Sequence, residues 1–427
     1  MDHGGRFHHE EPFGHESRNS FFDQEGLVPY RPGGYHPVSL GDCFKEGRYQ
    51  VHHKLGWGGF STVWLAKDKI RDEWVALKVL AARVDQEKSS REISILRELS
   101  NSPDAAQTCI VRLLDDFHHT GPNGRHQCLV LELLGPSLIN VIDGANPMPG
   151  QPRGEDDGMI AEDIFRVARQ LLSALAVLHE NGIAHGDISS HNVAFCASNI
   201  RHASEEDVLG VVGTPVVEDL IREDGQPVEP RFPKHLVRRA EWFGWVGEGV
   251  EDIRLADWGE SFRLGEEPPR LAQPADCKAP ETIFTERLDY RVDLWRAGLV
   301  IYHMAIGYKP FGAYREDAFL VSQMIGFIED LPDEWKGKWR KMKEESEESY
   351  DDVDPDSHWL EKRFDELVQD PRDPSLRPLL PVIKGLMRFR PSDRLSAAQA
   401  LELVPEIDPE PLTEVKSRMY YKSTVIL

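Results

Sequence analysis

The sequence predicts an α+β fold in two lobes, and three observations support this. The chain has 427 residues, which is enough for two lobes or domains. Apolar runs typical of strands lie in the first 135 residues, together with a single amphipathic helix. The next regular pattern is helical, over residues 163–181, where apolar side chains recur every three to four positions.

Composition indicates a globular protein without a membrane-spanning segment. Hydrophobic residues make up 40% of the chain and charged residues 29%. There is no apolar run of about 18 residues and no apolar signal core near residue 1. The five cysteines are scattered, without a C-x-x-C pair, which favours a reducing compartment. We therefore expect the protein in the cytoplasm, the nucleus or both.

The formal net charge of −23 restricts the class of partner. Nucleic acid is disfavoured as a primary ligand, because binding phosphates requires neutralisation by Lys and Arg. An acidic surface attracts and orients basic partners. Alternatively, the negative charge serves only to keep the protein soluble.

Residues 1–34 are predicted to be a flexible N-terminal segment, because they are rich in His, Gly, Glu and Ser and have little periodicity. Several histidines lie there, but their spacing does not match a metal-ligand set, so a solvated tail is the simpler interpretation. The folded part is predicted to begin near Tyr35.

A glycine-rich turn follows a predicted strand over residues 49–55. It has the sequence Gly56-Trp57-Gly58-Gly59-Phe60-Ser61, with Ser61 at the position of the third glycine of a G-x-G-x-x-G pattern. Such glycines let a strand–turn–strand lie close to phosphates with its N–H groups facing them. Any hairpin can carry G-x-G, but no helix follows directly, which disfavours a dinucleotide-binding turn.

Lys78 lies in the middle of a second apolar strand, residues 74–80. A lysine in such a run needs an anionic partner. The next amphipathic helix, residues 89–99, offers Glu92. Alternatively, Glu92 is one more exposed helix glutamate.

The stretch His185-Gly186-Asp187-Ile188-Ser189-Ser190-His191-Asn192 comes directly after the helix that ends at Gly182. In phosphoryl transfer an Asp positions the attacking hydroxyl, and an Asn downstream holds a magnesium ion. An Asp-x4-Asn pair alone also fits a loop built from two turn-forming residues.

Four further motifs follow in a fixed order. A strand over residues 253–256 ends in Asp257-Trp258-Gly259, and an Asp at such a place can bind magnesium. The others are Ala279-Pro280-Glu281, Asp293-Leu294-Trp295-Arg296-Ala297-Gly298, and Arg390-Pro391-Ser392-Asp393-Arg394-Leu395 before a short helix over 397–403.

With this ordered set of motifs the chain resembles a eukaryotic protein kinase, over roughly residues 48–403. It looks most similar to the SR-protein kinases, especially their divergent fungal members. Two segments carry that resemblance, residues 33–38 (Gly-Gly-Tyr-His-Pro-Val) and the glycine-rich segment 55–65. A long insertion between the catalytic loop and Asp257 is also typical of that family.

The resemblance implies a two-lobed protein kinase fold. Residues 35–134 would form a small antiparallel β N-lobe with one helix, and residues 135–405 a mainly α-helical C-lobe. The C-lobe range contains an insert at about 198–248 and an acidic insert at about 340–358, and residues 406–427 form a tail. Glu281 and Arg394 would form a buried ion pair.

The resemblance also implies roles for single residues, with ATP and Mg²⁺ as cofactors. Asp187 would be the catalytic base, Lys78 would bind the α- and β-phosphates while pairing with Glu92, and Asn192 and Asp257 would bind Mg²⁺. The implied nucleotide-binding residues are Leu55, Gly56, Trp57, Gly58, Gly59, Phe60, Ser61, Val63, Ala76, Lys78, Glu92, Glu132 and Leu134.

Three positions depart from the kinase pattern. Ser189 stands where kinases carry a lysine that neutralises charge on the transferred phosphoryl group. Pro274 stands in place of a threonine, and Gly186 in place of an arginine. His191 or Lys278 could supply the missing charge. Ser189→Lys should raise turnover unless another residue already neutralises that charge.

Between Asp257 and Glu281 the only hydroxyl side chain is Ser261, so no phosphorylation switch is expected there.

The expected function is ATP-dependent phosphorylation of Ser or Thr in an Arg-rich protein by a monomer that binds neither nucleic acid nor membrane. The acidic run 344–356 is either a solvated segment or a docking tract for Arg-rich substrate. Two alternatives remain at this point. One is a pseudokinase or scaffold, and the other is a small-molecule kinase of the aminoglycoside or choline type, whose catalytic loop also fits H-G-D-x-x-x-x-N.

Overall fold

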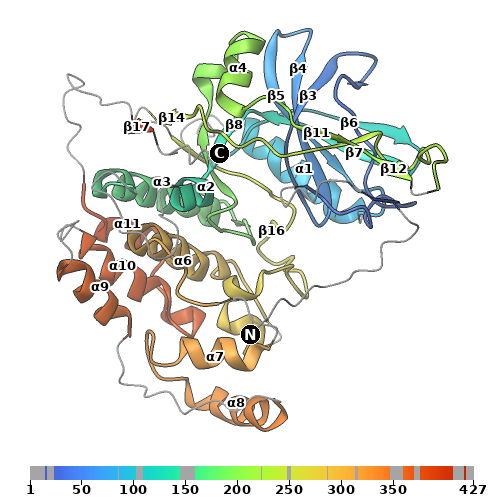
Figure 1. Ribbon diagram of the computed structural model, residues 1–427. Coiled ribbons are helices and arrows are strands. Elements are labelled where there is room, and N and C mark those ends of the chain that lie inside the picture. Colours follow the sequence, from blue (N-terminus) through green and yellow to red (C-terminus); the bar gives the residue numbers. More distant parts are fainter. Residues whose placement is uncertain are drawn as a thin grey trace, which may run out of the picture. The chain divides into compact units, whose positions relative to one another are not determined.

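The computed structural model of the chain describes residues 15–16, 24–84, 86–101, 109–144, 159–222, 224–247, 252–285, 287–312, 316–346, 359–369, 376–406 and 418–419. The chain divides into two compact units (Figure 1). Unit 1 comprises Met1–Ile93, Arg112–Leu134 and Ala197–Gly244. Unit 2 comprises Ser94–Val111, Gly135–Cys196 and Trp245–Leu427.

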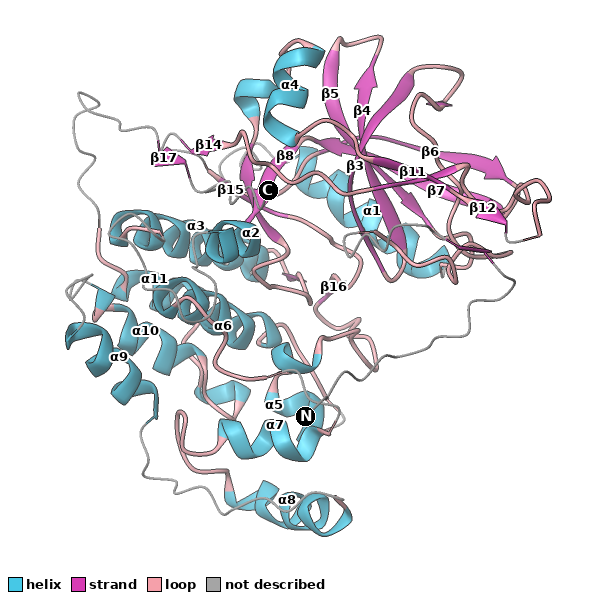
Figure 2. Ribbon diagram, in the orientation of Figure 1, coloured by secondary structure: helices cyan, strands magenta, loops and turns pink. Residues whose placement is uncertain are grey.

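Unit 1 is built on a six-stranded sheet with the strand order β2-β3-β4-β5-β7-β6. The strands are β2 (Cys43–Phe44), β3 (Tyr49–Gly58), β4 (Ser61–Asp68), β5 (Glu73–Leu80), β6 (Leu113–Gly121) and β7 (Gly124–Glu132). Every pairing in it is antiparallel. The helix α1 (Gln86–Asn101) follows β5. This antiparallel sheet with a helix confirms the predicted β lobe (Figure 2).

The central strand β5 is buried along all eight of its residues, which explains its unbroken apolar sequence. Its register is fixed on both sides, since Lys78 pairs with Val63 of β4 and with Leu129 of β7. Lys78 therefore sits at a defined place in the middle of the sheet.

The segment 197–244 belongs to unit 1, whereas the sequence prediction placed an insert at about 198–248 within the C-lobe range. It contains α4 (Glu205–Val212) and the strands β11 (Val217–Asp219), β12 (Ile221–Arg222) and β13 (His235–Val237). The indole N–H of Trp74 donates to Ala203 O at 2.9 Å, and Val237 lies in the core of the sheet. The insert packs on unit 1 because side chains such as these are buried there. The sequence of the insert has little periodicity and therefore did not indicate this packing.

Residues 24–34 also pack on unit 1, although the prediction assigned residues 1–34 to a flexible segment. Glu25 and Tyr30 are both almost fully buried, and the Tyr30 hydroxyl donates to Glu25 at 2.5 Å. Lys54 of β3, equally buried, forms an ion pair with Glu25. A buried lysine requires such a partner, and the carboxylate comes from a segment that has no periodic pattern. Farther out, β1 (His15–Glu16) pairs with β12.

Unit 2 is mainly helical, as predicted. Its helices are α2 (Leu138–Gly144), α3 (Ala161–Glu180), α5 (Pro280–Phe284), α6 (Val292–Ile306), α7 (Asp317–Met324), α8 (Asp333–Glu345), α9 (Trp359–Gln369), α10 (Leu379–Leu386) and α11 (Ala397–Leu403). Its short strands are β9 (Ile183–Ala184), β10 (Val193–Cys196), β14 (Val246–Gly247), β15 (Ile253–Leu255), β16 (Phe262–Arg263) and β17 (Arg418–Met419), and β8 (Leu134–Ser137) joins β10 and β15 in a sheet.

The helix α6 lies at the centre of unit 2, packed against α3 and α10. All fifteen of its residues are buried, including the charged Asp293 and Arg296. Charged side chains in such a helix must be paired or hydrogen-bonded, so their partners define what the helix holds in place.

Glu281 and Arg394 form the buried ion pair that the kinase resemblance implies. The guanidinium donates to both carboxylate oxygens, at 2.7 and 2.6 Å, and also to Arg291 O at 2.7 Å. The Arg394 side chain is fully buried, and that of Glu281 is 2% exposed. The pair ties α5 to the segment before α11. Within the described residues, no helix combines the length and apolar character needed to cross a bilayer.

Arg394→Met should destabilise unit 2 strongly, because it leaves the Glu281 carboxylate buried without its counter-charge. Breaking a buried pair on one side costs about 3–5 kcal/mol. The measurement is urea unfolding followed by circular dichroism. Arg390→Met is the matched control, since Arg390 pairs with Glu334 at the surface and its loss should change the unfolding midpoint little. Equal effects of the two substitutions would contradict the structural role of Arg394.

Candidate functional site

The glycine-rich turn joins β3 and β4 of unit 1. Gly58 pairs with Ser61, so Gly59 and Phe60 form a tight two-residue loop. A Cβ atom added at Gly56, Gly58 or Gly59 would meet no atom within 4 Å, and none of the three has a positive φ. Neither packing nor backbone conformation within the chain therefore requires these glycines. The open space beside them leaves room for a close ligand such as a nucleotide phosphate.

Tyr35 fastens this turn from the N-terminal side. Its hydroxyl donates to the carbonyl oxygen of Gly58, and its ring packs edge-on against Tyr30 at 5.7 Å between centroids. The sequence analysis used Tyr35 as the start of the folded part and as part of the family resemblance. Its spacing of 23 residues from Gly58 carried no signal of this contact.

Glu92 of α1 is the anionic partner of Lys78. The Lys78 Nζ atom lies 2.8 Å from Glu92 Oε1, and the two side chains are only 8% and 5% exposed. Nζ is an ammonium with three donors, the kind of group that binds carboxylate and phosphate oxygens. The pair fixes the position of Lys78 between β4 and β7.

The other predicted nucleotide residues of unit 1 lie on or next to the same sheet. Leu55, Trp57 and Val63 are on β3 and β4, and Ala76 on β5 pairs with Leu131. Glu132 ends β7, where its carboxylate accepts from Arg112 N at 2.9 Å, and Leu134 begins β8.

Asp293 holds the stretch His185–Asn192 of unit 2, which is called the catalytic loop here after the kinase resemblance. Its carboxylate accepts from the backbone N–H groups of His185 and Gly186, both at 2.8 Å, and lies 3.2 Å from His179 Nε2. Burial opposes ionisation, but the hydrogen bonds from His179 and His185 outweigh it and hold the pKa of Asp293 below its usual range. The first two backbone N–H groups of the loop are therefore hydrogen-bonded to a buried carboxylate whose position is fixed.

Asp187 and Asn192 are hydrogen-bonded within that loop. Asn192 Nδ2 donates to Asp187 O and to Asp187 Oδ2, both at 2.8 Å. Because both partners are oxygens, the amide nitrogen must face them, and Asn192 Oδ1 is turned away. That oxygen is then available as a hard ligand of the kind that Mg²⁺ prefers.

Asp257 follows β15 and adopts a left-handed conformation with φ of 59°. The neighbouring backbone is tied to the catalytic loop, since Ala256 N donates to Asn192 O at 2.8 Å. No group of three or more His, Cys, Asp or Glu side chains within the described ranges could hold a metal by itself. One carboxylate and one amide fit Mg²⁺, which takes few protein ligands and completes its shell with water and phosphate.

Burial raises the pKa of Asp187, and the adjacent guanidinium of Arg296 acts in the opposite direction. Arg296 Nη1 lies 2.5 Å from Asp187 Oδ1. The sequence analysis quoted Arg296 within a motif but gave it no role. An arginine inside a mainly apolar helical pattern was the available signal, because such a charge needs a partner.

Gly186 occupies the position where many kinases carry an arginine. Its φ is +76°, and an added Cβ would lie 2.4 Å from Glu260 O. A side chain there is therefore excluded in this conformation. Ser261, the one hydroxyl between Asp257 and Glu281, is 1% exposed and donates to Trp258 O at 2.6 Å. The segment is instead tied by an ion pair between Arg263 and Glu98.

Comparison with known proteins agrees with this geometry. Residues 49–201 match the protein kinase domain family. The chain is 30% identical to the serine/threonine-protein kinase SRPK of Physarum polycephalum over 309 residues, which cover 70% of this chain and 69% of that protein.

The chain belongs to the protein kinase family. Two further relatives place it with the SR-protein kinases within that family. Protein kinase dsk1 of Schizosaccharomyces pombe is 42% identical over 269 residues, which are 62% of this chain and 46% of dsk1. Human SRSF protein kinase 3 is 40% identical over 190 residues, 43% of this chain and 32% of that kinase. The matched part of this chain therefore spans less than half the length of dsk1 and about a third of the length of SRSF protein kinase 3.

Gly186→Ala should lower the stability of this kinase-family chain more than Gly182→Ala. Both glycines have positive φ, 76° and 70°, so both substitutions carry the strain of a left-handed residue, ~1–2 kcal/mol. Only at Gly186 does the added methyl group meet a backbone oxygen. Urea unfolding midpoints of the two variants measure the difference. Equal midpoints would show that the catalytic loop yields to the extra atom.

Proposed function

We propose that this chain is an ATP-dependent serine/threonine protein kinase. The observation that carries the proposal is the arrangement around Asp187, a carboxylate whose two oxygens are separately held by Asn192 Nδ2 at 2.8 Å and Arg296 Nη1 at 2.5 Å. A carboxylate held this way has a fixed orientation, which is what a group positioning a substrate hydroxyl needs.

The remaining residues receive their roles through the kinase resemblance. Lys78, held by Glu92, would bind the phosphates of ATP, and the turn around Gly56, Gly58 and Ser61 would cover them with backbone N–H groups. Asn192 Oδ1 and the Asp257 carboxylate would hold Mg²⁺. The bound ion would neutralise charge on the phosphates, and Asp187 would accept the proton of the attacking hydroxyl.

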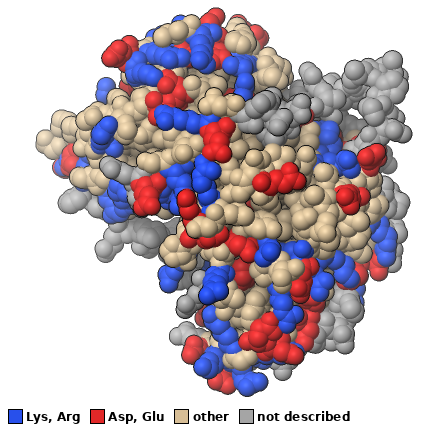
Figure 3. All heavy atoms as spheres, turned by 180° about the vertical axis from the view of Figure 1, so that it is seen from behind, with Lys and Arg blue, Asp and Glu red and all other residues tan. Residues whose placement is uncertain are grey.

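The proposed substrate is a protein with serine in an Arg-rich context. Relatives with the names serine/threonine-protein kinase SRPK and SRSF protein kinase 3 support this, together with the net charge of −23. Acidic and basic side chains alternate on the face in Figure 3. A basic substrate docking there would therefore meet local carboxylates and not one continuous acidic field. Most of the acidic run 344–356, from residue 347 on, lies outside the described residues.

A pseudokinase or scaffold is the second candidate, and Ser189 is the observation that favours it. The usual catalytic-loop lysine is absent there, so nucleotide could bind without efficient transfer. The small-molecule kinase alternative is disfavoured, because the Glu281–Arg394 pair and the relatives are those of protein kinases. A monomeric state, the absence of nucleic-acid and membrane binding, and a cytoplasmic or nuclear location stay predictions from the sequence.

The deciding experiment incubates the purified chain with radiolabelled ATP and Mg²⁺ on two peptides, one of Arg-Ser repeats and one of Lys-Ala repeats interrupted by single serines. Transfer to the Arg-Ser peptide with at least tenfold higher kcat/KM supports the proposed function and substrate. Nucleotide binding without transfer to either peptide or to the protein itself would establish the scaffold. Transfer only to an amino sugar or choline would establish the small-molecule kinase.

Asp187→Asn should lower kcat by about 10²–10⁴-fold, the usual contribution of a positioned base, and leave the affinity for ATP nearly unchanged. The substitution leaves the buried Arg296 guanidinium without its counter-charge, so the thermal midpoint should also fall, and kcat is compared at a temperature where the variant is folded. Activity is measured with the Arg-Ser peptide and nucleotide binding by fluorescence titration. Turnover at the wild-type rate would remove Asp187 from the proposed mechanism.

A further inference from the structure

Arg296 is an isolated cation in the interior of unit 2. It sits in the middle of α6, its side chain is fully buried, and its neighbours along the helix are apolar apart from Asp293. Placing a guanidinium there costs several kcal/mol of desolvation unless hydrogen bonds and an opposite charge compensate. Its partners are therefore the reason for its presence.

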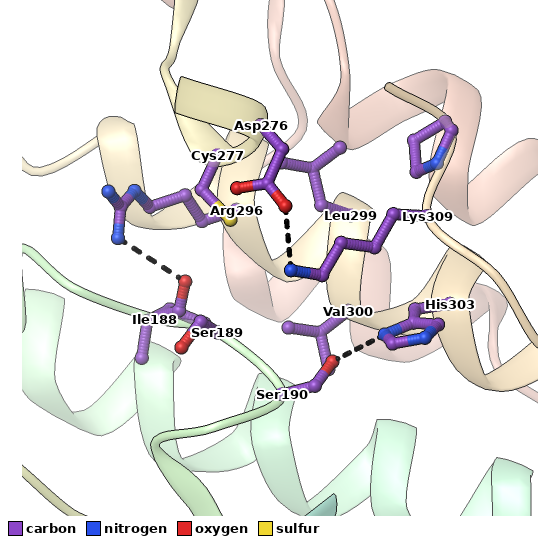
Figure 4. Close-up of a pocket in the computed structure, with 11 residues that line it drawn as sticks. Ile188, Ser189, Ser190, Asp276, Cys277, Arg296, Leu299, Val300, His303 and Lys309 are labelled. Carbon is purple, nitrogen blue, oxygen red and sulfur yellow. Dashed lines mark hydrogen bonds and ion pairs between the residues drawn. The ribbon is translucent and has the colours of Figure 1, made fainter. Parts of the chain in front are cut away.

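Those partners all belong to the catalytic loop. Nη1 donates to Asp187 Oδ1 at 2.5 Å and approaches Ile188 O at 3.4 Å (Figure 4 shows the contact to Ile188). The other carboxylate oxygen of Asp187 accepts from the neutral amide of Asn192. Within the part of the chain that the structure describes, Arg296 is the one cation hydrogen-bonded to Asp187.

Two lysines of unit 2, Lys309 and Lys278, are paired with carboxylates other than Asp187. Lys309 lies 2.7 Å from Asp276, and Lys278 lies 2.5 Å from Asp317. Figure 4 shows the ammonium of Lys309 joined to the Asp276 carboxylate. Lys278, which the sequence analysis offered as one substitute for the missing lysine, is thus already paired with a carboxylate.

Two further donors of Arg296 are unused. Nε and Nη2 are buried and have no hydrogen-bond partner among the described residues. Arg296 is also one of the residues that line a small pocket, together with Ser189 and Ser190. A purely structural arginine would be expected to satisfy these donors, because an unpaired buried N–H costs free energy.

We infer that Arg296 is the positioning residue of the catalytic loop and provides beside Asp187 a positive charge that the loop, with Ser189, lacks. In this chain the fixed positive charge comes from α6, beneath the loop, and not from the loop itself. It holds the Asp187 carboxylate in a fixed orientation while the substrate hydroxyl gives up its proton. This inference rests on the proposed kinase function, since it concerns the residue that serves its base.

The test moves the charge back to the loop. Four full-length proteins are compared in one peptide assay: wild type, Arg296→Met, the double variant Ser189→Lys/Arg296→Met, and Ser189→Met/Arg296→Met. Arg296→Met should lower kcat by about 10²-fold, as removal of one electrostatic group does, with the KM for ATP within about threefold of wild type. The lysine double variant should recover at least tenfold in kcat over the methionine double variant.

Controls separate this role from a packing role. Arg390→Met, which removes a surface arginine of unit 2, should keep the wild-type kcat. Thermal midpoints and fluorescence titration with ATP establish which variants are folded. A packing role for Arg296 predicts equal kcat for the two double variants, because both lack the arginine and differ only in charge at position 189.

The outcomes are distinguishable. No transfer by wild type refutes the proposed function itself. If the wild type transfers phosphate, two results overturn the inference about Arg296. One is a folded Arg296→Met variant with the wild-type kcat, and the other is equal kcat for the two folded double variants. If no methionine variant folds, Arg296→Lys decides. A folded lysine variant should keep at least a tenth of the wild-type kcat, and a folded but inactive one overturns the inference.

Discussion

Two buried charges on one turn of α6 hold the catalytic loop, and the arrangement of the candidate site depends on them. Asp293 and Arg296 are three residues apart and so lie on one side of the helix. Asp293 accepts the backbone N–H groups at the start of the loop, and Arg296 pairs with the carboxylate of Asp187. Because α6 is buried along its whole length, core packing fixes both charges. The stability of the core and the geometry of the proposed base are therefore coupled.

The sequence predicted the parts of the fold that repeat with a regular period or carry a specific motif. The strand around Lys78, the helix carrying Glu92 and the short helix 397–403 are where the apolar patterns placed them. The ion pair of Glu281 and Arg394 followed from the kinase resemblance and is present. These features are determined locally, or by motifs whose spacing in the family is fixed.

The features that escaped prediction depend on contacts between residues far apart in the sequence. Arg296 and Asp187 are separated by 109 positions, and Tyr35 and Gly58 by 23. Glu25 lies in a segment with no periodicity, yet the buried ammonium of Lys54 requires it. The insert 197–244 lacked a period strong enough to reveal which unit it packs on. For Arg296 and Lys54 a buried charge needed a partner, and only the tertiary structure identifies which residue supplies it.

The central claim is that Arg296 is the counter-charge of Asp187 in the working enzyme. The most direct measurement is a crystal structure of the wild-type chain with Mg²⁺, a non-hydrolysable ATP analogue and an Arg-Ser peptide. The account predicts that Arg296 Nη1 stays within hydrogen-bond distance of Asp187, with the peptide hydroxyl facing the same carboxylate. An Arg296 side chain turned away, with Lys309, His191 or a substrate arginine beside Asp187 in its place, would contradict it.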